Sequence, residues 1–211
     1  MGRIRKIERS PKSGRNYYVV DACFLVNKYI PPECAPNDRE RERIVKCREW
    51  WQEIDSQIDA RKARVYIPDI CIAESFKTLA KKYFVDHWFS SATQLNSAKI
   101  RMRRDIVVSP RTLRSLRREV RYHDISTSRD IIISVDRFFE HFLKKNLKVS
   151  LADLIILATA KYLMDFYDLP KKLLHIITLD NDLWKGSHKI SELPRAYDPT
   201  RAVDAEVRVF F

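Results

Sequence analysis

The chain has 211 residues, of which 45% are hydrophobic and 32% are charged, and its formal net charge is +12 at pH 7. This composition is typical of one globular domain with a sizeable core, and it excludes an intrinsically disordered chain. No apolar run approaches the roughly 18 residues of a membrane span, and the N-terminus lacks the apolar core of a signal peptide. We therefore expect a cytoplasmic protein that does not contact the membrane.

The excess of positive charge indicates a polyanionic partner, with nucleic acid the commonest candidate. A generally basic, well-solvated surface is an alternative that charge alone leaves open. The four cysteines show no C-x-x-C spacing and the five histidines are scattered, so no zinc site is predicted. Cys23 and Cys71 lie in apolar runs, where a free thiol behaves as a small hydrophobic group.

The N-terminal part of the chain predicts a tail, a strand and a long helix. Residues 1–15 are basic with little apolar periodicity and are expected to form a flexible tail. Residues 17–20 are β-branched or aromatic, as in a buried strand. Asn37 or Asp38 then caps a helix that continues at apolar helical spacing to about Ala63.

A second strand and a second helix follow directly. Residues 64–68 (RVYIP) predict a short strand that ends at Pro68, and Asp69 opens the next helix. The predicted apolar face of this helix consists of Ile70, Ala73, Phe76, Ala80 and Phe84.

The segment from His87 to Leu147 is less regular. Within it we expect an amphipathic helix over residues 112–121, a possible strand over residues 122–127 and a helix that Ser128 begins. The role of residues 87–121 stays open at this point.

The last part of the chain completes an alternation of strands and helices. Ser150 caps a further helix, the strand at residues 173–179 follows it, and residues 192–211 supply one last strand and a tail. No repeat or Gly/Ser linker interrupts the chain, so residues 16–211 are expected to form a single domain with an extra basic helical segment around 87–121. The alternation favours an α/β fold with a central parallel sheet and helices on both faces.

Five acids follow predicted strand ends or lie near the start of the helices after them: Asp21, Glu74, Asp153, Asp180 and Asp182. Strand C-termini and the following helix N-termini share one edge of such a sheet, where ligands bind, so these acids could converge. Each acid also has a structural alternative. Asp21 and Asp180 could cap helices, Asp153 could form a capping box with Ser150, and Glu74 could be a solvated helix residue.

Taken together, the acids favour a divalent cation. Clustered carboxylates repel one another, and a bound cation relieves that repulsion. The candidate ligands are all oxygens, which suits Mg²⁺ or Mn²⁺ rather than zinc. Such a metal activates water near neutral pH and stabilises charge on a transferring phosphoryl group. An acidic metal site in a basic protein therefore indicates phosphodiester hydrolysis.

Four stretches, VVDACFLV, IPDICIAESF, SLADLIILATA and IITLDNDL, resemble in that order the motifs of PIN-domain nucleases. The likeness is closest to the VapC-type toxin ribonucleases of bacterial and archaeal toxin–antitoxin pairs, and it covers roughly residues 16–86 and 122–185. The resemblance implies a PIN-like α/β/α sandwich. It also implies a metal-binding quartet of Asp21, Glu74, Asp153 and Asp180, with Asp182 as an accessory acid and Thr178 as a hydroxyl beside the site.

The same resemblance implies an activity and partners. The activity is endoribonuclease cleavage with Mg²⁺ or Mn²⁺, which leaves a 5′-phosphate and a 3′-hydroxyl, and the implied partners are RNA, an antitoxin protein and a second copy of the chain. The sequence departs from the family pattern where Ala22 and Cys23 replace a frequent hydroxyl residue and where Leu183 replaces Phe. The chain is also longer than the compact toxins.

The stretch PRTLRSLRREVRY places arginines at helical spacing on one face: Arg111, Arg114, Arg117, Arg118 and Arg121. Guanidinium groups pair with phosphates in bidentate fashion, so this face is a candidate for contact with an RNA backbone. A solvated helix face and a docking site for an acidic partner segment are the alternatives.

The sequence therefore predicts a metal-dependent endoribonuclease. The rival from another class is a non-catalytic RNA-binding or assembly protein on the same fold. A phosphohydrolase of small phosphate esters ranks third, since the D-x-D-x-T and G-x-x-x-x-G-K signatures are missing.

Overall fold

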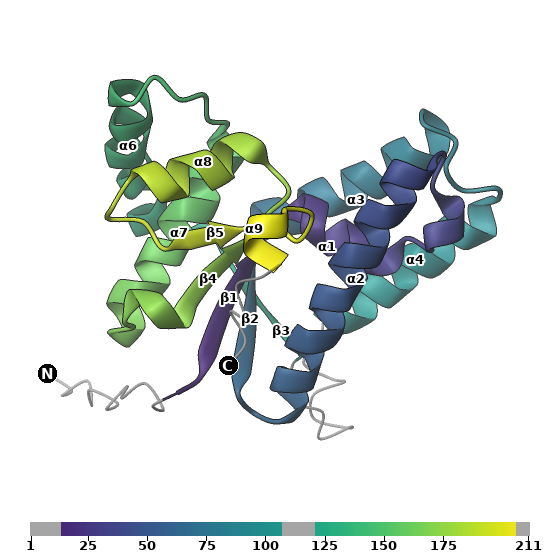
Figure 1. Cartoon of the computed structure of the whole chain (residues 1–211), viewed down its shortest axis with the longest axis horizontal. Coiled ribbons are helices and arrows are strands. Elements are labelled where there is room, and N and C mark those ends of the chain that lie inside the picture. The colour runs from purple at the N-terminus through teal and green to yellow at the C-terminus, as the bar shows by residue number, and fades with distance from the viewer. Residues whose placement is uncertain (1–13, 107–120, 206–211) are drawn as a thin grey trace, which may run out of the picture.

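A computed structural model of the protein describes residues 14–106 and 121–205. Within these ranges the chain forms one sheet of parallel strands in the order β3-β2-β1-β4-β5 (Figure 1). The strands are β1 (Asn16–Val20), β2 (Ala63–Pro68), β3 (Tyr122–Ile125), β4 (Leu174–Ile177) and β5 (Arg195–Tyr197). The predicted α/β class with a central parallel sheet is confirmed. Most of the predicted basic tail, residues 1–13, lies outside the described residues.

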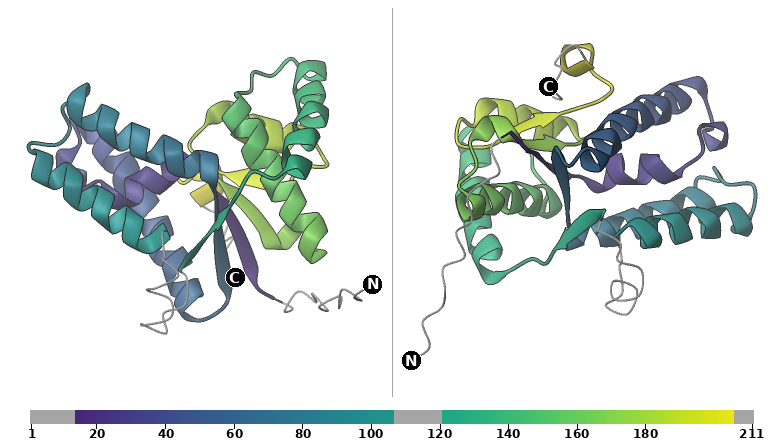
Figure 2. Two further views of the ribbon diagram at one scale, coloured as in Figure 1. Left: turned by 180° about the vertical axis from the view of Figure 1, so that it is seen from behind. Right: turned by 90° about the horizontal axis from the view of Figure 1, so that it is seen from below.

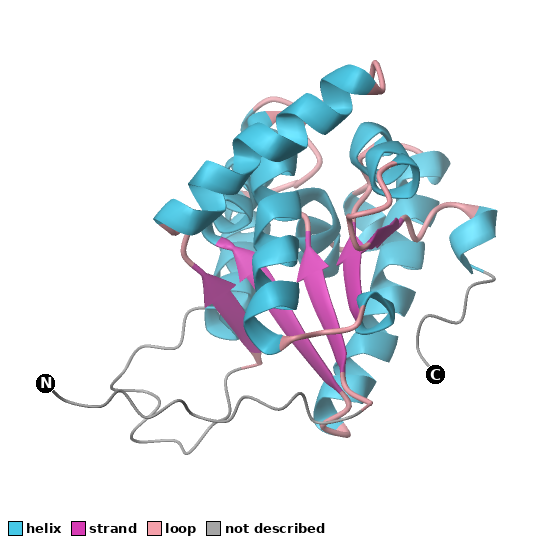
Figure 3. Ribbon diagram, turned by 90° about the vertical axis from the view of Figure 1, so that its left-hand side faces the viewer, coloured by secondary structure: helices cyan, strands magenta, loops and turns pink. Residues whose placement is uncertain are grey.

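Helices flank the sheet on both faces. They are α1 (Ala22–Tyr29), α2 (Asp38–Asp59), α3 (Asp69–Phe84), α4 (Ala92–Ile106), α6 (Arg129–Lys144), α7 (Leu151–Tyr167), α8 (Asn181–Lys189) and α9 (Ala202–Ala205), with short 3₁₀ turns η1 (Pro32–Cys34) and η2 (Lys171–Leu173). The sheet separates α1 to α4 from α6, α7 and α8 (Figure 2). Figure 3 shows the strands between these two layers. No helix in the described part of the chain is long and apolar enough to span a membrane.

Strand β1 occupies the centre of the sheet because nearly all of its side chains can be buried. Its sequence NYYVV is β-branched and aromatic, and its last four residues are buried. Val19 pairs in register with Tyr66 of β2 on one side and with Ile176 of β4 on the other. The chain continues from β1 to β2 and β3 in one direction, and from β4 to β5 in the opposite direction. The ends of β1 and β4 therefore form the switch point at which open α/β sheets bind ligands.

Side-chain caps fix three helix starts where the sequence predicts them. Asn37 accepts a hydrogen bond from the backbone N–H of Glu40 at 2.9 Å, and Ser128 accepts one from Ile131 at 3.4 Å. Ser150 opens α7 in a capping box. The first helix of these three, α2, ends at Asp59 rather than near Ala63, because Arg61 adopts φ 60° and turns the chain toward β2.

The predicted apolar face of α3 is correct only in part, because Ile70 and Phe76 are half-buried and pack against the core. The buried residues of this helix are Cys71, Ser75 and Leu79, whereas Ala73 and Phe84 are exposed. The Ser75 hydroxyl donates to the carbonyl of Cys71 at 2.7 Å and lies 3.4 Å from the carbonyl of Ala22. Small side chains thus allow α3 to approach α1 closely, and this contact decides which face is buried.

Helix α4 was not predicted from the sequence. It buries a stripe at helical spacing made of Leu95, Ala98, Met102 and Ile106. It packs against α1, α3 and β3, so it belongs to the core of the same domain.

Candidate active site

Asp21 lies at the switch point and is almost fully buried. Its backbone N–H donates to the carbonyl of Ile177 in β4 at 3.0 Å, and its side chain is 5% exposed. The Thr178 hydroxyl donates to Asp21 Oδ2 at 2.9 Å. Although Asp21 occupies the N-cap position of α1, its side chain makes no cap hydrogen bond. The backbone N–H groups of Cys23 and Ala22 lower the pKa of this carboxylate, but less than the hydrogen bond from Thr178 does, so capping of α1 is a minor part of its setting.

Thr178 joins the ends of β4 and β1. Its hydroxyl also accepts a hydrogen bond from the backbone N–H of Asp180 at 2.9 Å, and its own N–H donates to the carbonyl of Tyr197 at 3.0 Å. The side chain is fully buried. Thr178 thus holds the carboxylate of Asp21 and the backbone of Asp180 at a fixed separation.

Asp153 completes the capping box of α7, and Asp180 is the N-cap of α8. Asp153 Oδ2 accepts from the backbone N–H of Ser150 at 3.0 Å and from its hydroxyl at 2.6 Å. Asp180 Oδ1 accepts from the backbone N–H groups of Asp182 and Leu183 at 2.8 and 2.7 Å. Within the described residues, all of these bonds fall on one oxygen of each carboxylate. The second oxygen, Oδ1 of Asp153 and Oδ2 of Asp180, has no hydrogen bond there.

Glu74 lies in the second turn of α3 and is half-buried. Its carboxylate makes no hydrogen bond or ion pair with any residue that the structure describes. A solvated position is therefore only partly correct, because the side chain is sheltered without being paired.

The electrostatics show that these acids lie within range of one another. Burial and, to a smaller extent, the charge of Asp153 raise the pKa of Asp21 to about 6, against the hydrogen bond from Thr178. Burial and then the charge of Asp153 raise the pKa of Glu74.

Asp153 interacts electrostatically with each of the other four acids. Burial raises its pKa, the two hydrogen bonds from Ser150 lower it, and the charges of Asp180 and Asp182 raise it again. The structure therefore brings all five predicted acids to one edge of the sheet. Joint ionisation of Asp21, Glu74 and Asp153 is unfavourable unless a cation neutralises them.

The carboxylates are not arranged as a closed metal site. Among the side chains that the structure describes, no group of three His, Cys, Asp or Glu residues is positioned to hold one metal ion. Asp153 and Asp180 contact their own helix termini instead. The chemistry of the donors still fits a hard cation, since the groups at this edge are carboxylate and hydroxyl oxygens.

Cys23 lies beside the acids rather than in the core. Its side chain is exposed, so the prediction that it acts as a small buried hydrophobic group is wrong. Desolvation, followed by the negative charge of Asp21, raises the pKa of its thiol to about 12. In the absence of a metal, Cys23 therefore remains a neutral thiol at pH 7.

A basic pocket adjoins the acids. It has a volume of about 430 Å³ and lies between the start of α2, Leu179 and the loop after β5. Its lining holds the cations Arg39, Arg43, Lys46 and Arg201 together with the acids Glu40, Glu42 and Asp198. Arg43, Lys46 and Arg201 each form an ion pair with one of these acids. Arg39, Arg43 and Lys46 recur at helical spacing in the sequence, so their pattern could have predicted a row of cations on α2.

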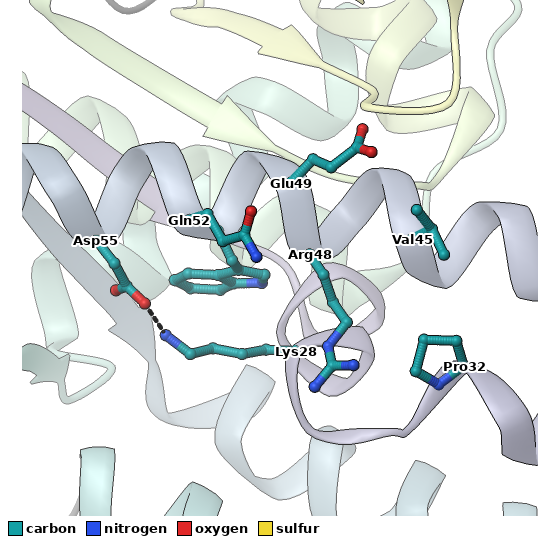
Figure 4. Close-up of a pocket in the computed structure, with 8 residues that line it drawn as sticks. Lys28, Pro32, Val45, Arg48, Glu49, Gln52 and Asp55 are labelled. Atoms are coloured by element: carbon teal, nitrogen blue, oxygen red, sulfur yellow. Dashed lines mark hydrogen bonds and ion pairs between the residues drawn. The ribbon is translucent and has the colours of Figure 1, made fainter.

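A larger pocket of about 530 Å³ lies elsewhere, between α1, η1 and α2 (Figure 4). Lys28 and Asp55 form an ion pair of 2.5 Å in it, and the Lys28 ammonium lies 4.6 Å from the ring centroid of Trp51. None of the predicted site residues lines this pocket, and its buried lysine is fully paired. It is therefore not the site of the acids.

The predicted basic helix cannot be placed in full. Arg111, Arg114, Arg117 and Arg118 lie outside the described residues. Arg121 forms ion pairs with Asp55 at 3.3 Å and with Asp59 at 3.0 Å. The structure thus commits Arg121 to the end of α2.

Comparison with known proteins supports the fold. No protein-family model and no curated protein matches the sequence. Among solved structures, the chain is similar to VapBC2 from Rickettsia felis bound to a DNA fragment from their promoter, with 12% identity over 86% of this chain and 98% of that one and a TM-score of 0.51. FitAB bound to the IR36 DNA fragment matches with 16% identity over 86% and 94% of the two chains and a TM-score of 0.51. At these identities the likeness shows the PIN-like α/β fold that the sequence motifs predict.

Proposed function

We propose that this protein is a metal-dependent endoribonuclease. Asp21, Glu74, Asp153 and Asp180, with Asp182 as an accessory acid, are the proposed ligands of one or two Mg²⁺ or Mn²⁺ ions. The products would carry a 5′-phosphate and a 3′-hydroxyl.

One observation carries the proposal. Asp21 is a buried carboxylate whose side chain makes no cap hydrogen bond, and its pKa is raised by burial and by the charge of Asp153. A buried carboxylate in this position destabilises the fold unless a bound cation or another partner compensates its charge. Perturbed groups of this kind concentrate at functional sites, and this one stands at the switch point of the sheet.

The residues of the chain divide the work at this edge. Thr178 orients Asp21 through the 2.9 Å hydrogen bond. Asp153 and Asp180 each keep one oxygen in a cap and present a second oxygen without a partner in the described structure. A bound Mg²⁺ or Mn²⁺ would supply a nucleophile near neutral pH and stabilise charge on the phosphoryl group. Because no three ligands are preset among the residues that the structure describes, cation binding would require the acidic side chains to turn toward one another.

Basic residues would supply affinity for the RNA backbone. In the pocket that adjoins the acids through Leu179, Arg39 makes no ion pair within the described residues, whereas Arg43 and Lys46 pair with Glu40 and Glu42. The segment with Arg111, Arg114, Arg117 and Arg118 would add further phosphate contacts.

We further propose that the protein acts as the toxin of a toxin–antitoxin pair. Its partners would then be an antitoxin protein and a second copy of the chain. The likeness to chains of the VapBC2 and FitAB structures supports this part of the proposal, since both are described as assemblies bound to DNA.

The test is cleavage of a mixed set of end-labelled RNAs by the intact protein. We expect cutting with Mn²⁺, none with EDTA, and none with Asp21→Asn in the presence of Mn²⁺. Asp136→Asn is the matched control, because it makes the same change at an exposed position of α6. Full activity of the Asp21→Asn variant would remove Asp21 from the site.

A non-catalytic RNA-binding protein is the second candidate. The caps formed by Asp153 and Asp180, and the absence of a preset group of three ligands among the described residues, favour it. Such a protein would bind RNA equally well with Mn²⁺ and with EDTA and would never cut it. The same experiment therefore separates the two candidates.

A further inference from the structure

A third pocket lies away from the acids, between the C-terminal half of α7 and the strands β2 and β3. Its volume is about 280 Å³. The residues that give it its chemistry are Arg64, Tyr66, His123, Tyr162, Phe166 and Tyr167. Neither the proposed metal site nor the basic pocket uses any of them.

The rings that line this pocket pack against one another, and Phe166 also meets Tyr167 edge to face at 4.9 Å. Tyr66 stacks on His123 with ring centroids 5.3 Å apart, and its hydroxyl lies 3.3 Å from that of Tyr167. Tyr162 and Phe166 stack at 5.6 Å. Phe166 is nevertheless 36% exposed. A flat ligand that covered this ring would bury apolar surface and add stacking.

The polar groups of the pocket suit a nucleotide. Burial, and then the charge of Arg64, lower the pKa of His123, so that its ring is neutral at pH 7 and can stack. The Arg64 guanidinium, which hydrogen-bonds Tyr66, offers a planar donor for a phosphate or a base edge. Asp124 at the rim can accept from an exocyclic amino group.

We propose that this pocket binds one unpaired nucleobase of single-stranded RNA. The base would stack on Phe166 and His123, while Arg64 pairs with the backbone. The inference rests on the RNA substrate proposed above. The pocket lies just below the usual 300–1,000 Å³ range of small-molecule sites, which suits a single base.

The pocket also fixes where that base stands relative to the acids. Asp153 is in the first turn of α7 and Phe166 is in its last turn. At 1.5 Å per residue these two positions are about 20 Å apart along the helix axis. The bound base therefore belongs to a nucleotide some distance from the bond that the acids would cut.

The experiment is fluorescence anisotropy of a labelled single-stranded RNA decamer of mixed sequence, titrated with the full chain in EDTA. Phe166→Ala should weaken binding at least about 5-fold, the lower end of the effect of losing one aromatic stack. Arg64→Gln should weaken binding as well. Phe84→Ala, which removes a 68% exposed ring from the end of α3, is the matched control and should bind as the wild type does.

Wild-type affinity of the folded Phe166→Ala variant, or no RNA binding by the wild type, would overturn the proposal. The test of this pocket is independent of the test of nuclease activity. Phe166-dependent binding without any cleavage in Mn²⁺ would keep the pocket and reject the nuclease. Cleavage in Mn²⁺ by the wild type, together with an RNA affinity that Phe166→Ala does not change, would keep the nuclease and reject the pocket.

Discussion

Asp21 opposes the stability of the fold that contains it. At pH 7 the side chain is ionised and 5% exposed, although burial raises its pKa to about 6 from an ordinary value of 3.8. The folded state holds the proton more tightly than the unfolded state. Stability is therefore lost as pH rises through this window, by about 3 kcal/mol at most.

Asp21→Asn should consequently stabilise the protein while it abolishes cleavage. Asparagine carries no charge, and its carbonyl oxygen can still accept from Thr178. We expect the free energy of urea unfolding in EDTA at pH 7 to rise by about 1–3 kcal/mol. Mn²⁺ should raise the melting temperature of the wild type and leave that of the variant unchanged. A destabilised Asp21→Asn would show that the carboxylate has a structural role.

His175 has the opposite effect on the pH dependence of stability. It is 5% exposed in β4, and burial lowers its pKa to about 4. Between pH 6.5 and 4 the unfolded state binds a proton that the folded state refuses, so stability falls as pH falls. In the wild type, protonation of Asp21 offsets part of this loss over the same window.

The effect of His175 should therefore be measured with Asp21 removed. We expect Asp21→Asn to lose about 2 kcal/mol of unfolding free energy through His175 between pH 7 and pH 5. Adding His175→Phe should remove most of that loss, because phenylalanine fills the aromatic site without titrating. Urea titrations at both pH values give the comparison. An unchanged slope in the double variant would show that another group controls the acid sensitivity.

At the scale of elements, Gly186 lets α8 pack on α6. A Cβ at this position would overlap the ring of Phe142, which is fully buried. Gly186→Ala should lower the free energy of unfolding by about 1–3 kcal/mol through overpacking, even though alanine favours helix by about 1 kcal/mol.

The neighbouring exposed substitution Lys185→Ala is the control and should have little effect. Combining Gly186→Ala with Phe142→Leu should cost less than the sum of the two single changes, because the smaller side chain removes the overlap. Urea unfolding of the four proteins measures this coupling. A Gly186→Ala variant as stable as the wild type would mean that the α6–α8 contact adjusts freely.

The helices show which features of the fold could be predicted from the sequence. Caps at Asn37, Ser128 and Ser150 were predictable because a cap depends on residues within one helical turn. The buried face of α3 was not, because its contact with α1 favours small Cys71 and Ser75 over larger apolar neighbours. Helix α4 was not predicted because its apolar stripe is narrow and the rest of its surface is polar.

The candidate site likewise has features that could be predicted from the sequence and features that could not. The placement of Asp21 and Asp180 follows from strand ends, and a parallel sheet brings strand ends together wherever they occur in the chain. Both the metal interpretation and the capping interpretation of Asp153 and Asp180 were available from sequence. The structure shows the caps, and it shows that capping is only a minor part of the setting of Asp21. Side-chain direction decided this point, and residue spacing alone does not specify it.

At the scale of the whole molecule, the excess of 12 positive charges should dominate RNA affinity. Each phosphate contact with single-stranded RNA adds about 0.7 to the slope of log affinity against log salt. Replacing Arg111, Arg114, Arg117 and Arg118 together by glutamine should reduce that slope by up to about 3 if all four contact phosphates. Arg121→Gln should leave the slope nearly unchanged, because Arg121 is paired with Asp55 and Asp59. Anisotropy in EDTA at several salt concentrations measures the slope without cleavage. Equal slopes for the wild type and the fourfold variant would assign the segment to a solvated surface or to a protein partner.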